Sequence, residues 1–219
     1  MQDRFRNLKA GMNALTYSAP GTISANKYTE LLLADPDNYE LLHASMFRPI
    51  HITMQIAFGD QKDLVGAQLG SSYGAYLLFL QEEMGMKGMV GIDVDPIAGK
   101  YAEKIGVRVL QHDARALPFE NASLDVVFSN HFLDPLYCGI IDAANGLSAG
   151  SNCPSFFRDV LKEIYRVLKP SGIYIMQNEL PDYYRTRRSY LSPFSSAEVY
   201  PPEALLLDPM LGYIAVLQK

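Results

Sequence analysis

The sequence predicts an α/β protein whose mostly parallel β-sheet is covered by helices on both faces. From residue 64 onward, short apolar segments of strand length alternate with longer segments of helical periodicity. Proline and glycine stand at the ends of the helical segments, where they start or stop a helix; Pro96 and Gly106 bracket one of them. A strand–helix alternation of this kind is typical of an open sheet wound in both directions.

The alternation defines strands and helices in a fixed order. We expect strands at 64–69, 89–95, 107–111, 124–130, 172–178 and 212–219. We expect helices at 74–85, 96–106 and 154–170. The last helix has the clearest pattern, because Phe157, Leu161, Ile164 and Leu168 share one face, and Pro170 is expected to end it.

Residues outside this alternation suggest an appended segment and an insertion. We expect 1–60 to form an N-terminal helical extension and 61–219 to form the main domain. Residues 51–59, "HITMQIAFG", fit a helix or a strand. Residues 179–206 are rich in Tyr, Arg, Ser and Pro, and we expect an irregular insertion there.

Composition excludes several classes of protein. The net charge of −5 argues against a general nucleic-acid binder. No apolar run reaches the roughly 18 residues of a membrane span, and the first residues contain no apolar core of a signal peptide. Cys138 and Cys153 suit neither a disulfide framework nor metal-ligand spacing. We therefore expect a cytoplasmic protein without a metal site, and the oligomeric state stays open.

A glycine-containing turn follows the first strand, in "LVGAQLGSSYGAYLLFL", residues 64–80. Gly66, Gly70 and Gly74 would let a ligand approach the backbone and the following helix N-terminus. Asp93 ends the second strand, 23 residues after Gly70, and could accept hydrogen bonds from ribose hydroxyls. Glycine can also serve turn geometry alone, and Asp93 could be a solvated strand end. On these residues a nicotinamide cofactor fits as well as another nucleoside.

Three further segments resemble the class I S-adenosylmethionine-dependent methyltransferases, especially the branch that acts on small molecules. They are Asp113-Ala114 after the third strand, Leu117-Pro118-Phe119 before the strand "LDVVFSN", and "RVLKPSG" at 166–172. The resemblance covers roughly residues 60 to 180. It implies a Rossmann-like, doubly wound sheet of seven strands and S-adenosylmethionine as the cofactor.

The resemblance also implies roles for individual residues. Gly70 and Gly74 would lie against the methionine end of the cofactor, and Asp93 would bind its ribose. Asp113 would accept from the adenine amino group, with the Ala114 amide facing the ring. Asn130 and His131, at the end of the fourth strand, would border the transferred methyl group. His131 is our candidate base, because an unperturbed histidine titrates near neutral pH.

The first motif departs from the family at two positions of the cofactor site. Gln68 stands where the family has an acid, and Ser72 stands where it has a glycine. A carboxylate would give a charge-assisted hydrogen bond to the cofactor's ammonium group, whereas Gln68 gives a neutral one. The leading hypothesis is therefore a methyltransferase with a small-molecule acceptor. A non-catalytic binding module and an NAD(P)-dependent reductase remain as alternatives.

Overall fold

The computed structural model describes residues 48–72, 74–82, 84–96, 98–130, 132–133, 153–178, 193–200 and 213–219. The chain divides into two units, Met1–Arg48 and Pro49–Lys219. All but Arg48 of the first unit lies outside the described residues, including the helical patterns expected there, so the boundary expected at residue 60 stays a prediction. Apart from Arg48, the first residue of one helix, the elements described below lie in the second unit.

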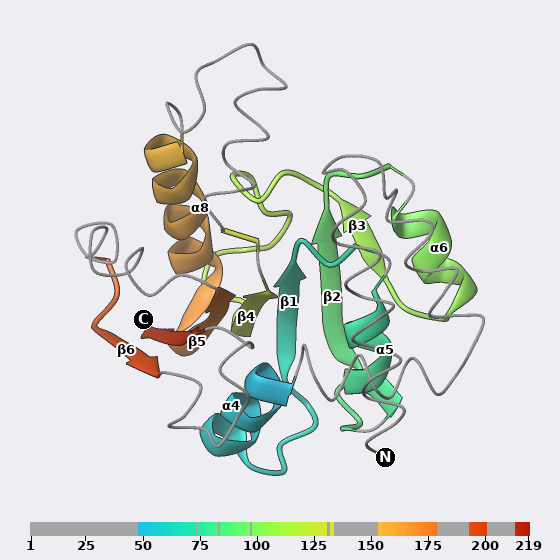
Figure 1. Ribbon diagram of the computed structural model, residues 1–219, viewed down its shortest axis with the longest axis horizontal. Coiled ribbons are helices and arrows are strands. Elements are labelled where there is room, and N and C mark those ends of the chain that lie inside the picture. Colours follow the sequence, from blue (N-terminus) through green and yellow to red (C-terminus); the bar gives the residue numbers. More distant parts are fainter. Residues whose placement is uncertain are drawn as a thin grey trace, which may run out of the picture. The chain divides into compact units, whose positions relative to one another are not determined.

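A seven-stranded sheet forms the centre of this unit, in the order β3-β2-β1-β4-β5-β7-β6 (Figure 1). Its strands are β1 (Val65–Leu69), β2 (Gly88–Asp93), β3 (Val109–Gln111), β4 (Leu124–Asn130), β5 (Leu168–Asn178), β6 (Ser196–Tyr200) and β7 (Tyr213–Gln218). The first five pair in parallel, whereas β7 runs antiparallel to both β5 and β6. The predicted Rossmann-like, mostly parallel sheet is confirmed.

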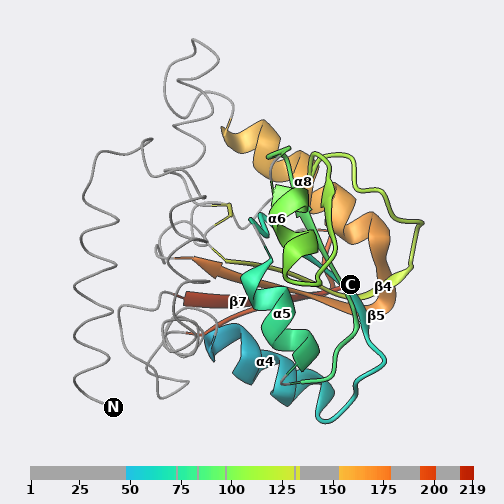
Figure 2. The same ribbon diagram turned by 90° about the vertical axis from the view of Figure 1, so that its right-hand side faces the viewer.

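Four described helices accompany the sheet: α4 (Arg48–Phe58), α5 (Ala75–Glu82), α6 (Ala98–Lys104) and α8 (Cys153–Val167). The segment that fitted a helix or a strand is helix α4, and its Ile50 and Met54, four residues apart, are fully buried. Figure 2 shows α4 and α8 on opposite faces of the sheet. Helices therefore cover both faces, as predicted.

The chain reverses its direction across the sheet between β1 and β4. It moves from β1 through α5 to β2 and from β4 through α8 to β5, in opposite directions along the sheet. Because such crossovers are right-handed, the two connections lie on opposite faces and leave a crevice where β1 and β4 end. The fold thus places the candidate site beyond Leu69 and Asn130.

Side-chain alternation gives the two faces of the sheet different surroundings. Ala67 and Leu69 of β1 and Val127 of β4 join the apolar core that also contains Ile164 and Leu161 of α8. Gln68 pairs in register with Phe128, and both point to the opposite face because alternate residues of a strand do so. There Tyr76 of α5 packs edge-on against Phe128, with ring centroids 5.4 Å apart.

Arg166, at the end of α8, holds the loop that precedes β4. Its guanidinium donates to the carbonyls of Leu117 and Phe119 at 3.0 and 2.8 Å, and to the side chain of Asn121 at 2.9 Å. It also forms a fork with Glu163, whose Oε2 accepts from the backbone N–H of Leu117. We call Glu163 and Arg166 the α8 clamp. The clamp joins two of the segments that carried the family resemblance.

Two elements differ from the sequence expectations. Helix α8 ends at Val167 rather than at Pro170, because Leu168 already pairs with Leu124 and begins β5. Strand β6 falls inside the range 179–206 that we expected to be irregular, where it pairs with β7. Most of that range lies outside the described residues.

Candidate functional site

The turn after β1 contains three residues in the left-handed backbone region. They are Gly70 (φ 63°), Ser72 (φ 49°) and Gly74 (φ 80°). Glycine adopts this conformation at little steric cost, whereas a serine is strained there. The Gly70 and Gly74 positions are therefore required by backbone geometry, and Ser72 departs from what the geometry favours.

Different neighbours approach the two glycines of this turn. A Cβ added at Gly70 would lie 2.7 Å from Cδ2 of Phe132, which follows β4. A Cβ added at Gly74 would lie 2.6 Å from Cγ2 of Val107, which precedes β3. In the described residues, close approach at both glycines thus comes from the chain's own side chains. The expected contact with the methionine end of a cofactor stays a prediction.

The carboxylate of Asp93 accepts hydrogen bonds from the turn after β1 and from the segment after β2. Its Oδ2 accepts from the backbone N–H of Ser72 at 2.7 Å, and its Oδ1 accepts from the backbone N–H of Asp95 at 2.9 Å. A carboxylate has about four acceptor positions, so these two bonds leave capacity on each oxygen. The arrangement can therefore fix the carboxylate and still receive two hydroxyl donors from a ligand.

Val94, next to Asp93, is an apolar side chain that is 67% exposed. Exposed single apolar residues are common, but this one follows the carboxylate at the crevice edge. It offers a surface on which a flat ring could pack. Sequence reasoning missed Val94, although an apolar residue between the two acids Asp93 and Asp95 was a usable signal.

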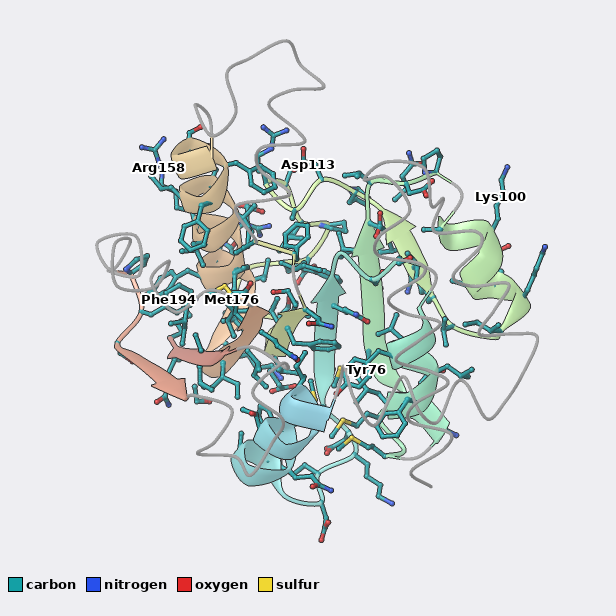
Figure 3. The ribbon with its side chains drawn as sticks, viewed as in Figure 1. Tyr76, Lys100, Asp113, Arg158, Met176 and Phe194 are labelled. Atoms are coloured by element: carbon teal, nitrogen blue, oxygen red, sulfur yellow. The ribbon has the colours of Figure 1, made fainter. Side chains whose placement is uncertain are left out.

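Asp113 lies on the loop after β3, at the end of the sheet toward which the arrow of β1 points (Figure 3). Its carboxylate accepts a fork from Arg115, with Nε–Oδ1 at 3.0 Å and Nη2–Oδ2 at 2.6 Å. The side-chain hydrogen bonds from Arg115 lower the pKa of Asp113 against the opposing effect of burial. The predicted adenine-binding carboxylate is thus ionised and already oriented. The adjacent Ala114 side chain belongs to the apolar core.

Two amide side chains at the ends of β1 and β4 hold buried oxygens without a hydrogen-bond donor among the described residues. They are Oε1 of Gln68 and Oδ1 of Asn130. Gln68 is only 3% exposed. Because Gln68 pairs with Phe128, Asn130 is two residues farther along the adjacent strand and on the same face. A buried acceptor without a donor costs about 1–3 kcal/mol, which a ligand donor could recover.

Some predicted site residues cannot be placed. His131, the candidate base, lies outside the described residues, as do Cys138 and most of the insertion expected at 179–206. The structure therefore brings Gln68, Asn130, Asp93 and the 70–74 turn to one end of the sheet, with Asp113 at the same end. Among the described residues, no group of three His, Cys, Asp or Glu side chains could hold a metal ion.

No helix within the described ranges is long and apolar enough to cross a membrane.

Comparison with known proteins gives a family match and distant relatives. Residues 67–176 match the model of the family described as "Methyltransferase domain". A probable phthiotriol/phenolphthiotriol dimycocerosates methyltransferase 2 of Mycobacterium ulcerans is 27% identical over 57% of this chain and 44% of the relative. An EEF1A lysine methyltransferase 4 of Bos taurus is 31% identical over 54% of this chain and 46% of the relative. This chain spans less than half the length of these two relatives.

Solved structures give the same fold at low sequence identity. A SAM-dependent methyltransferase of Aquifex aeolicus aligns with a TM-score of 0.55 at 17% identity, over 90% of this chain and 98% of that one. One of Archaeoglobus fulgidus aligns with a TM-score of 0.54 at 15% identity, over 78% and 94%. The family model covers 110 of the 219 residues. The chain therefore belongs to the class I S-adenosylmethionine-dependent methyltransferase domain family.

Proposed function

We propose that this chain binds S-adenosylmethionine at the carboxyl ends of β1, β2 and β3 and directs its methyl group to a small-molecule acceptor. The observation that carries the proposal is the pair of buried amide oxygens on Gln68 and Asn130. The methionine end of the cofactor has an ammonium group, which is a set of N–H donors. Such donors suit two acceptors that lie at the crevice and lack donors among the described residues.

The remaining polar groups suit the other parts of the same ligand. Asp93 has acceptor positions left for two ribose hydroxyls, since its bonds to Ser72 and Asp95 use only part of its capacity. Asp113 is ionised and could accept from the adenine amino group. The exposed side chain of Val94 could pack against the purine. These residues therefore favour a ligand that consists of a nucleoside with a charged tail and that lies along the crevice.

When bound, S-adenosylmethionine supplies a methyl group on a positively charged sulfur. The chain's own residues then have to hold the acceptor in line with that methyl group, exclude water and take up the acceptor's proton. We assign proton removal to His131, directly after Asn130 at the end of β4. Its neutral ring would accept the proton from an acceptor hydroxyl or amine.

The names of the two relatives give different acceptors. One names phthiotriol and phenolphthiotriol dimycocerosates, and the other names a lysine of EEF1A. Since these names disagree, neither fixes the acceptor here. We propose a small-molecule acceptor because segments 113–119 and 166–172 resemble the branch of the family that acts on small molecules.

Titration calorimetry tests the cofactor proposal directly. We expect S-adenosylhomocysteine to bind the wild-type chain more tightly than NAD does. Asp93→Ala should weaken this binding by about 1.5–3 kcal/mol, the scale of hydrogen bonds to a charged group. Glu103→Gln, on the exposed part of α6, is the matched control and should leave the affinity unchanged. Tighter binding of NAD would refute the proposal.

The second candidate is a non-catalytic module with the same fold. Phe132 fills the space beside Gly70, and Gln68 and Ser72 replace the acid and the glycine expected in the first motif. A pocket that has lost its ligand would show all three features. Failure of S-adenosylhomocysteine to bind at millimolar concentration would favour this candidate. A transfer assay with a labelled methyl group then separates binding from turnover.

A further inference from the structure

Arg115 makes more contacts with Asp113 than an ordinary surface ion pair. Its Nε lies 3.0 and 3.1 Å from the two carboxylate oxygens, and its Nη2 lies 2.6 Å from Oδ2. The backbone N–H of Arg115 donates to Oδ1 at 2.8 Å. Both carboxylate oxygens are therefore held, and rotation of the carboxylate would break several hydrogen bonds at once. A forked arginine is the geometry in which a surface pair does matter.

The guanidinium of Arg115 is itself supported from α8. Its central carbon lies 5.6 Å from the ring centroid of Phe156, within the range of a cation–π contact. Phe156 in turn packs against Phe132 with ring centroids 6.2 Å apart, and Phe132 approaches Gly70. A continuous row of side chains thus joins the loop after β3 to the turn after β1. The contact with Phe156 gives the Arg115 guanidinium a second neighbour besides Asp113.

We propose that Arg115 is a positioning residue that fixes the Asp113 carboxylate and thereby makes the site selective for a 6-aminopurine over a 6-oxopurine. The inference rests on the proposed function, because it takes Asp113 as the acceptor for the amino group of the base. It concerns Arg115 and Phe156, which the family resemblance assigned no role. Arg115 does not touch the ligand in this proposal; it acts through Asp113.

A fixed carboxylate favours binding of the amino purine and disfavours binding of the oxo purine. An amino group donates to it without an entropic cost of first orienting the carboxylate. A 6-oxo group instead presents its own oxygen, and a carboxylate that cannot turn away leaves two acceptors facing each other. Loss of the fork lets the carboxylate rotate, which weakens binding of the amino purine and relieves the repulsion of the oxo purine. Selectivity therefore falls even though Asp113 remains.

The test compares binding of S-adenosylhomocysteine and S-inosylhomocysteine by calorimetry. Arg115→Met keeps an unbranched side chain but removes the fork, and we expect it to lower the affinity ratio at least about threefold. Arg115→Lys keeps the charge without the fork and should give an intermediate ratio. The backbone N–H at 115 still holds Oδ1, so the ratio should fall rather than vanish. Phe156→Leu should lower the ratio in the same direction.

Control variants separate positioning from a general loss of structure. Arg108→Met removes an exposed arginine that precedes β3, and it should leave the ratio unchanged. In an Asp113→Asn background, Arg115→Met should have no further effect on the ratio if Arg115 acts through the carboxylate. Thermal melting of each variant shows that it is folded.

The outcomes distinguish this inference from the proposed function. If neither ligand binds the wild-type chain, both are overturned. If S-adenosylhomocysteine binds the wild type and Arg115→Met leaves the ratio unchanged, or tightens binding of the adenosine ligand, the positioning role alone is overturned. A ratio that falls in Arg115→Met but not in the Asp113→Asn background supports it.

Discussion

The backbone N–H of Ser72 donates to Oδ2 of Asp93 at 2.7 Å, and this bond ties the turn after β1 to the end of β2. Ser72 reaches that position with a φ of 49°, in the left-handed region. The bond uses the backbone of residue 72 and not its side chain. The hydroxyl-bearing side chain is therefore a source of strain that the bond itself does not need.

Ser72→Gly should raise the free energy of unfolding by about 0.5–1 kcal/mol. Relief of the left-handed strain exceeds the greater freedom that glycine gains in the unfolded chain. Urea unfolding measures the change. Ala122→Gly is the matched control, because Ala122 also has a positive φ (54°) and lies outside the crevice. It should stabilise the protein similarly without changing ligand affinity. A clear loss of stability in Ser72→Gly would show that the serine side chain contributes.

Gln68→Glu should destabilise the ligand-free protein by about 2–4 kcal/mol at pH 8, since it buries a carboxylate without a described donor. Burial raises the pKa of an acid above its unfolded value of about 4.3. The penalty is therefore absent below that value and grows as the pH rises toward the folded pKa. Unfolding curves at pH 5 and pH 8 measure this difference.

The same variant tests where the cofactor's ammonium group lies. Saturating S-adenosylhomocysteine should restore more stability to Gln68→Glu than to the wild type. 5′-Methylthioadenosine lacks the ammonium group and should not do so. Equal recovery with both ligands would place the ammonium group away from Gln68.

Gly74→Ala should cost more stability than Gly106→Ala, although the two glycines have φ values of 80° and 78°. The added Cβ at Gly74 meets Val107 at 2.6 Å, whereas nothing lies within 4 Å at Gly106. The difference between the two variants isolates the packing cost from the backbone cost. Val107→Ala combined with Gly74→Ala should recover part of it. Equal losses at both glycines would mean that the Val107 contact is unimportant.

Glu163→Gln should lower the free energy of unfolding by about 1–2 kcal/mol at pH 7, because Gln keeps the shape but loses the charged fork with Arg166. The hydrogen bonds from Arg166 lower the pKa of Glu163 below its ordinary value of 4.5. A depressed folded pKa stabilises the protein above the unfolded pKa, and this contribution disappears as the pH falls through the folded pKa. The difference between variant and wild type should therefore shrink below about pH 4.5.

Urea unfolding between pH 7 and pH 3 measures how the stabilisation by ionised Glu163 disappears as the pH falls. Asp159→Asn is the control, since the ion pairs of Asp159 with Arg158 and Lys162 among the described residues are exposed. It should change the stability little at any pH in this range. A pH-independent deficit in Glu163→Gln would assign the effect to shape rather than to charge.

The parallel part of the sheet could be predicted because β1, β2 and β4 are short and mostly buried apolar segments, and β4 was predicted with its observed bounds. The C-terminal end of α8 and the strand β6 could not. The apolar helical pattern continues through Leu168, but pairing with Leu124 turns that residue into a strand. Strand β6 gains its conformation from pairing with β7, and its own sequence, "SAEVY", gives no strong signal. Tertiary contacts outweighed local preference at both places.

The candidate site was predictable where a residue's position in the sheet determines its role. Asp93 and Asn130 follow from their places at strand ends. The contacts of Arg115 with Asp113 and of Phe132 with Gly70 could not be predicted, because each depends on how loops fold over the carboxyl ends of the strands. Two of the three segments that indicated the family, 117–119 and 166–172, contact each other, since Arg166 donates to the carbonyls of Leu117 and Phe119.

The position of β7 between β5 and β6 has a consequence for biosynthesis. Strand β6 leaves the ribosome before β7, yet its described pairing in the sheet is with β7 alone. The nascent β6 segment must therefore wait, with its backbone unpaired in the sheet, until residues 213–218 emerge and insert beside β5. The five parallel strands contain the crevice residues and precede both. The half of the sheet that holds the candidate site can thus form before the other edge is complete.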